Sequence, residues 1–130
     1  MRKYRYRRQK GKMSKGEQEV VRILEENNIE YQKQKTFSSC VSEKGYPLRF
    51  DFYLPEYFTL IEYNGHHHYK PINKYKKAHI THEKTVVNDQ IKENFAVTNK
   101  FKFIKIPYWE FDNISYYITN IILERKGQNE

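Results

Sequence analysis

The chain has 130 residues and carries 24 Lys and Arg against 16 Asp and Glu, which gives a formal net charge of +8. This length suffices for one domain with a modest core, and 12 Tyr and 8 Phe argue against a disordered chain. The basic balance favours nucleic acid over membrane as a partner, and no apolar run is long enough to span a bilayer. A single cysteine, Cys40, and the lack of a signal peptide fit the cytoplasm.

Residues 1–13, MRKYRYRRQKGKM, combine many positive charges with almost no apolar side chains. Their mutual repulsion predicts a flexible basic arm ahead of the folded domain. Interleaved Arg and Tyr suit phosphate contacts and base stacking, although a solubilising tail is the alternative. The arm residues that we expect to contact nucleic acid are Arg2, Lys3, Arg5, Arg7, Arg8, Lys10 and Lys12.

A single domain is expected over residues 14–123, and a helix opens it. Ser14 and Glu17 form a capping-box pattern, in which each side chain binds the other residue's free backbone N–H. Apolar residues follow at helical spacing, and Asn27 and Asn28 end the helix. Glu17 lies on the apolar stripe, so it is either a cap alone or a cap that also points inward as a catalytic carboxylate.

Three strands are expected next: residues 29–37, then, after a loop over 38–47, two short strands on either side of a turn at Pro55. In residues 48–54, apolar side chains alternate with Arg49, Asp51 and Tyr53, which indicates a strand with one apolar face. In residues 59–64, Glu62 shares one face with Leu60 and Asn64. If these two strands pair as a hairpin, Asp51 and Glu62 can meet.

The remaining pattern predicts a helix over residues 79–99, a strand over 101–107, a helix over 114–123 and a polar tail over 124–130. The long helix allows a parallel crossover between the strand of Glu62 and the strand at 101–107. We therefore expect an α/β (α+β) fold, with a central mixed sheet of about four strands flanked by helices.

Two carboxylates brought together repel each other unless a cation or a shared proton lies between them. Asp51 and Glu62 would suit a hard divalent ion such as Mg²⁺, and Glu17 could complete the acidic cluster. Such a site favours phosphodiester hydrolysis, which needs charge stabilisation on the phosphate and an activated water. The alternative is that Asp51 and Glu62 form ordinary salt bridges with Arg49 or a nearby lysine.

Histidines and helical charges near this stretch have several possible roles. His66, His67 and His68 follow Glu62 closely and could act as metal ligands, bases or phosphate contacts. His79 and His82 are expected on a solvated face. Asp89 and Lys92, one turn apart, suggest an intrahelical ion pair, although either could face the site. Lys102 and Lys105 most simply serve solubility or contact DNA.

The order of these motifs resembles the PD-(D/E)XK nuclease superfamily, over roughly residues 14–111. The matching residues are Glu17 on the first helix, Asp51 in FDFYLP and Glu62 in IEYNG. Small Vsr-like and phage-type endonuclease domains are the most similar, because Gly65, the three histidines, Asp89 and IPYWEF at residues 106–111 follow in their order. The stretch SKGEQEVVRILEENNIEY also looks like the first helix of phage Holliday-junction resolvases.

The resemblance implies a restriction-endonuclease-like core and a Mg²⁺-dependent DNA endonuclease, with Mn²⁺ as a possible substitute, in a bacterial cell or a phage-infected host. It implies Asp51, Glu62 and Glu17 as metal ligands. The superfamily's lysine is replaced by Asn64, which can orient a water or bind phosphate but supplies no positive charge. In Vsr-like nucleases a histidine serves in this region, which implies His68 or His67 here with support from Asp89; Lys92 is the alternative, as a migrated lysine. Lys70 and Asn64 are expected to contact DNA.

Two further functions remain open from the sequence. One is a structure-selective Holliday-junction resolvase that acts as a homodimer. The other is a nucleic-acid-binding protein with a decayed active site, because Asn64 occupies the position of the superfamily's lysine. RNA is the alternative to DNA as the nucleic acid.

Overall fold

The computed structural model describes residues 13–65 and 76–129, with side chains described over 13–65 and 82–125. The fold is α+β, with a four-stranded mixed sheet and three helices, as the sequence predicts. In chain order the elements are α1 (Lys15–Glu26), β1 (Gln32–Val41), β2 (Pro47–Leu54), the 3-10 turn η1 (Pro55–Tyr57), β3 (Thr59–Asn64), α2 (Lys76–Thr98), β4 (Lys102–Pro107), the 3-10 turn η3 (Tyr108–Asn113) and α3 (Ile114–Asn129).

The sheet has the strand order β1-β2-β3-β4. Strands β1, β2 and β3 pair antiparallel, so the predicted hairpin around η1 is confirmed. Strand β4 pairs parallel with β3, which confirms the crossover through α2. The register joins Phe52 to Ile61 across the hairpin and Glu62 to Lys105 across the parallel pair. Strand β3, which carries Glu62, is therefore a central strand of the sheet.

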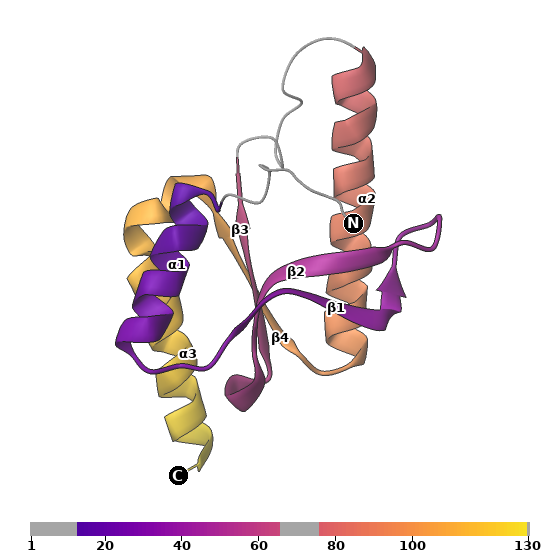
Figure 1. Ribbon diagram of the computed structural model, residues 1–130. Coiled ribbons are helices and arrows are strands. Elements are labelled where there is room, and N and C mark those ends of the chain that lie inside the picture. Colours follow the sequence, from indigo (N-terminus) through magenta and orange to yellow (C-terminus); the bar gives the residue numbers. More distant parts are fainter. Residues whose placement is uncertain (1–12, 66–75, 130) are drawn as a thin grey trace.

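The sheet separates two layers of helices: α1 and α3 lie on one side, and α2 lies on the other (Figure 1). The core divides in the same way. On the side of α1 and α3, Val20 and Leu24 of α1 pack with Ile61, Ile106 and Ile118. On the side of α2 a mainly aromatic cluster includes Phe37, Phe50, Phe95, Phe101 and Phe103, together with Leu60 and Cys40. No helix in the described part of the chain is long and apolar enough to cross a membrane.

The capping box at the start of α1 is confirmed in both directions. The backbone N–H of Glu17 donates to Ser14 Oγ over 3.2 Å, and the backbone N–H of Ser14 donates to Glu17 Oε1 over 3.0 Å. One turn of α1 also packs very closely on the sheet. A methyl group at Gly16 would lie 2.1 Å from the nearest ring atom of Tyr63. The absence of a side chain at Gly16 therefore allows α1 to approach β3 at the level of Glu17.

Several predicted boundaries were wrong. Strand β1 starts at Gln32, later than the predicted residue 29. It also runs into the predicted loop as far as Val41, because Cys40 is fully buried in the aromatic cluster. Helix α3 continues through the predicted polar tail to Asn129. There Glu124 pairs with Lys102 of β4, which gives the polar segment a tertiary contact.

The prediction that the apolar residues of β2 share one face was also wrong. Leu48 and Phe50 belong to the cluster on the side of α2, whereas Phe52 and Leu54 belong to the cluster on the side of α1 and α3. The strand therefore changes the face it presents at Asp51. All four apolar side chains are buried, and the residues between them are more exposed, so burial still alternates along the strand.

Candidate active site

Asp51 lies where β2 and β3 stop pairing through their backbones. The last backbone pair of the hairpin joins Phe52 to Ile61, and the same register continued by one residue would set Asp51 opposite Glu62. There the Asp51 side chain takes up a backbone donor, because its Oδ2 accepts a hydrogen bond from the N–H of Tyr63 over 2.9 Å. This bond holds the Asp51 carboxylate against β3 at Tyr63, the residue that follows Glu62.

Glu62 is a buried carboxylate with a lysine as its partner. Its residue is 3% exposed, and Lys92 Nζ of α2 lies 2.6 Å from Glu62 Oε2. The Lys92 amino group also lies 5.4 Å from the centre of the Phe50 ring, within the range of a cation–π contact. Helix α2 thus places one positive charge between the carboxylate on β3 and an aromatic ring on β2.

The carboxylates of this site resist ionisation. Burial, followed by the nearby negative charge of Glu62, raises the pKa of Asp51 to about 7, against an ordinary value of 3.8. The hydrogen bond from Tyr63 opposes this rise without cancelling it. Burial also raises the pKa of Glu62, and the charge of Lys92 counteracts that effect. Carboxylates with pKa values raised by burial and by neighbouring negative charge are typical of functional sites, although structural ion pairs can show the same shifts.

Two further carboxylates act on this pair through space. The charge of Glu17 contributes to the rise in the pKa of Asp51, and the charge of Asp89 contributes to that of Glu62. Glu17 therefore caps α1 and also lies within electrostatic reach of Asp51. Asp89 reaches the site from α2, one turn before Lys92. The structure brings Glu17, Asp51, Glu62 and Asp89 into one electrostatic cluster, with Lys92 as a positive charge within it.

Asn64 ends β3 on the same face as Glu62, two residues further along. It is 4% exposed, and its Oδ1 atom has no hydrogen-bond partner among the described residues. A buried amide oxygen without a partner is costly, and native proteins rarely leave one unless water or an ion completes it. A cation or a water molecule at the site would satisfy this oxygen.

The remaining predicted residues either fall outside the described part of the chain or have other surroundings. His66, His67, His68, Lys70 and the arm residues from Arg2 to Lys12 fall outside the described residues, as does the side chain of His79. His82 is partly buried. Lys102 forms an ion pair with Glu124, and Lys105 forms one with Glu93. Arg49 is exposed, and the partner of Glu62 is Lys92 instead.

Sequence reasoning left Lys92 with two roles and missed the part played by Tyr63. The spacing of Asp89 and Lys92 predicts a local ion pair, but the structure directs Lys92 to Glu62, which lies thirty positions earlier in the chain. The backbone N–H of Tyr63 donates to Asp51 and so fixes its carboxylate. The ring of Tyr63 packs against Gly16 of α1. Nothing in the residue type of Tyr63 signals a backbone role. Its position between Glu62 and Asn64 was the available indication.

The donor atoms suit a hard divalent ion held by few protein ligands. In the described ranges, no group of three or more His, Cys, Asp or Glu residues is arranged to hold a metal. Mg²⁺ needs no such cage, because it is usually bound through one or two carboxylates and keeps several waters. Asp51 and Glu62 supply the carboxylates, and Asn64, two residues after Glu62 on β3, has an unpartnered Oδ1. The residues present therefore fit Mg²⁺.

Comparisons of the chain with protein-family models, with curated proteins and with solved structures find no match. The superfamily resemblance therefore stays an interpretation of the motifs, and the site is interpreted from its own geometry.

Proposed function

We propose that this protein is a divalent-metal-dependent DNA endonuclease that hydrolyses phosphodiester bonds. The observation that carries the proposal is the buried constellation of Asp51 and Glu62 on adjacent strands, with the Lys92 amino group 2.6 Å from Glu62. Two carboxylates and a lysine are the group types that the PD-(D/E)XK motif combines. Here the lysine comes from α2, while Asn64 occupies the position on β3 where the motif usually has its lysine.

Each residue has a distinct task in this proposal. Asp51, fixed by the Tyr63 N–H, and Glu62 bind Mg²⁺, and Asn64 Oδ1 binds the ion or one of its waters. Bound Mg²⁺ would supply positive charge for the scissile phosphate and lower the pKa of a bound water. Lys92 supplies a fixed positive charge beside Glu62, where it can stabilise negative charge on the phosphate. Glu17 and Asp89 add negative potential that favours cation binding.

The histidines of residues 66–68 complete the proposal from the chain segment that follows β3. His67 or His68 is proposed as a general base or phosphate contact, and Lys70 with the basic arm as backbone contacts. The net charge of +8 supports a polyanionic substrate. DNA is proposed as that substrate because of the motif order.

A supercoiled plasmid incubated with the purified protein and Mg²⁺ or Mn²⁺ tests the proposal. The wild-type protein is expected to nick or linearise the plasmid, and Asp51→Ala is expected to leave it intact. Asp112→Ala is a suitable control, because Asp112 is an exposed aspartate in η3 and its loss removes the same charge. Absence of cleavage by the wild-type protein on duplex, single-stranded and four-way-junction DNA, with either ion, would refute the endonuclease proposal.

A nucleic-acid-binding protein without nuclease activity is the second candidate. The observation that favours it is the Glu62–Lys92 ion pair, which already satisfies the Glu62 carboxylate without a metal. The two candidates differ in metal binding. Isothermal titration of the wild-type protein with Mn²⁺ should show binding that Asp51→Ala abolishes if the site is a metal centre. DNA binding without metal binding would favour the second candidate.

A further inference from the structure

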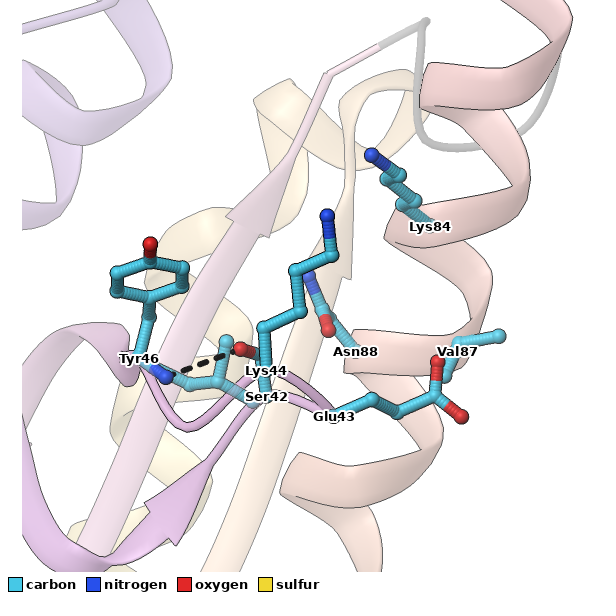
Figure 2. Close-up of a pocket in the computed structure, with 8 residues that line it drawn as sticks. Ser42, Glu43, Lys44, Tyr46, Lys84, Val87 and Asn88 are labelled. Carbon is cyan, nitrogen blue, oxygen red and sulfur yellow. Dashed lines mark hydrogen bonds between the residues drawn. The ribbon is translucent and has the colours of Figure 1, made fainter.

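A pocket of about 370 Å³ lies between the turn that joins β1 to β2 and the exposed side of α2. The turn supplies Lys44 and Tyr46 to its wall, and α2 supplies Lys84 and Asn88 (Figure 2). A volume of this size falls within the range of small-ligand sites. The acidic cluster does not include any of these four residues, so the pocket is distinct from the candidate active site.

The turn that carries Lys44 and Tyr46 is held by its own hydrogen bonds. The backbone N–H of Gly45 donates to the Ser42 carbonyl and that of Ser42 donates to the Tyr46 carbonyl, each over 2.8 Å. The N–H of Tyr46 donates to Ser42 Oγ over 3.1 Å. Gly45 has φ of +88°, a conformation that glycine adopts without strain. The two side chains therefore project from a fixed backbone.

The side chains around the pocket combine an aromatic surface with positive charge. Tyr46 is 67% exposed, so its side chain is accessible to a ligand. Figure 2 shows the amino groups of Lys44 and Lys84 extending to the same side of the turn as the Tyr46 ring. Glu43 also lines the pocket, but Figure 2 shows its carboxylate pointing away from both amino groups. One side of the pocket thus suits a phosphate next to a planar ring.

The pocket is aligned with Lys92 along α2. Lys84, Asn88 and Lys92 follow at intervals of four residues, which places them on one face of the helix. With a rise of about 1.5 Å per residue, Asn88 and Lys84 lie about 6 and about 12 Å from Lys92 along the helix axis. The pocket and the Glu62–Lys92 pair therefore lie along the same face of α2, about one to two helical turns apart.

We propose that this pocket binds one nucleotide of a single-stranded stretch of DNA, with the base stacked on Tyr46 and its phosphate between Lys44 and Lys84. Stacking on an aromatic ring beside basic groups is how proteins hold single strands without reading their sequence. Asn88 can donate to or accept from a base edge. The inference rests on the proposed function for its choice of DNA, and it adds a substrate subsite outside the catalytic residues.

Fluorescence anisotropy with a fluorescein-labelled single-stranded DNA oligonucleotide, in EDTA, tests this subsite without any need for cleavage. Tyr46→Ala is expected to weaken binding roughly 5- to 150-fold, which corresponds to the loss of one stacked base. Tyr46→Phe should bind like the wild-type protein, because it keeps the ring. Tyr116→Ala is the matched control: Tyr116 is 66% exposed on α3, and its loss should not change the affinity.

The charges are tested by the salt dependence of the same binding. The double variant Lys44→Gln/Lys84→Gln should lower the slope of log K against log salt by about 1.4, the value for two phosphate contacts on a single strand. Lys33→Gln/Lys100→Gln removes the same charge from exposed positions elsewhere and should leave the slope unchanged. Melting temperatures of all variants should match the wild-type value, because the altered side chains lie at the surface.

Equal affinities for Tyr46→Ala and Tyr116→Ala would overturn the subsite, as would equal salt slopes for the two lysine pairs. Neither result would affect the endonuclease proposal, which depends on Asp51 and Mg²⁺. Conversely, a protein that fails to cut any DNA but loses binding through Tyr46→Ala would support the subsite and refute the endonuclease. The two proposals therefore fail separately.

Discussion

The amino group of Lys92 lies 2.6 Å from the Oε2 atom of Glu62, so a lysine from α2 neutralises a carboxylate that β3 carries into the interior. Both side chains are largely buried, with 12% of Lys92 and 4% of Glu62 exposed. Water screens such a pair poorly, and each charge depends on the other for its place in the interior. The contact therefore couples the stability of the domain to its candidate site.

Replacement of Lys92 by methionine should destabilise the protein strongly. Lys92→Met leaves the Glu62 carboxylate buried without its partner, and a loss of about 3 to 5 kcal/mol in the free energy of unfolding is expected. The double variant Lys92→Met/Glu62→Gln should recover most of that loss, because neither position of the pair then carries a charge. Urea denaturation measures both. Neither variant should cut DNA, so the double variant separates a stable fold from an active site.

The pair Lys105–Glu93 is the comparison for this experiment. Its charged atoms lie 2.9 Å apart, but its side chains are 34% and 47% exposed. Exposed pairs contribute about 0 to 1 kcal/mol, so Lys105→Met should change the free energy of unfolding little. Equal losses for Lys92→Met and Lys105→Met would show that burial of the Lys92 pair has no energetic consequence.

The stability of the metal-free protein should fall as the pH rises from about 4 to about 7. In the folded protein the pKa of Asp51 is about 7, against an ordinary value of 3.8. Between these values the folded state binds more protons than the unfolded state, so the free energy of unfolding decreases with rising pH. The contribution of Asp51 is at most about 4 kcal/mol. The raised pKa of Glu62 acts in the same direction.

Urea denaturation in EDTA across this pH range, with the wild-type protein and Asp51→Asn, isolates that contribution. Asp51→Asn should be the more stable of the two at the upper end of the range, because it never carries the buried charge. Asp112→Asn, at an exposed position, should follow the wild-type curve. If the wild-type and Asp51→Asn curves run parallel, the pKa of Asp51 is not raised in the folded protein.

The sequence predicted the elements of this fold wherever the signal was local. The capping box of Ser14 and Glu17 spans four residues, and both of its hydrogen bonds form. The hairpin and the crossover followed from the order of a short turn and a long helix. By contrast, β1 extends to Val41 because Cys40 fits the aromatic cluster, which no local pattern around Ser38 and Ser39 could indicate.

The site was harder to predict, because its geometry depends on contacts between distant segments. Asp51 and Glu62 could be placed together from the hairpin alone. The hydrogen bond from the Tyr63 backbone to Asp51 could not, because every residue but proline has such a donor. Lys92 meets Glu62 only through the packing of α2 on the sheet, and its spacing from Asp89 suggested a local pair.

Gly16→Ala should destabilise the protein through the contact between α1 and β3. The new methyl group would lie 2.1 Å from the Tyr63 ring, so α1 or the ring must move. A loss of about 1 to 3 kcal/mol is expected, although alanine favours the helix more than glycine does. Tyr63→Leu should relieve the clash, so Gly16→Ala should cost less in that background. Urea denaturation of the four proteins measures this coupling, and strictly additive effects would contradict it.

Deletion of residues 1–12 should reduce the salt dependence of DNA binding and leave the stability of the folded domain unchanged. The segment contains Arg2, Lys3, Arg5, Arg7, Arg8, Lys10 and Lys12, and it ends before Ser14 caps α1. If about half of these charges contact phosphate, the slope of log K against log salt for duplex DNA should fall by roughly 3 units. Fluorescence anisotropy at several salt concentrations gives the slope, and thermal denaturation should give an unchanged melting temperature.

A variant that keeps the segment but replaces Tyr4 and Tyr6 with serine retains all the charge, so its slope should match that of the wild-type protein. An unchanged slope after deletion would show that the basic arm makes no phosphate contacts, and would leave the binding charge to the folded domain.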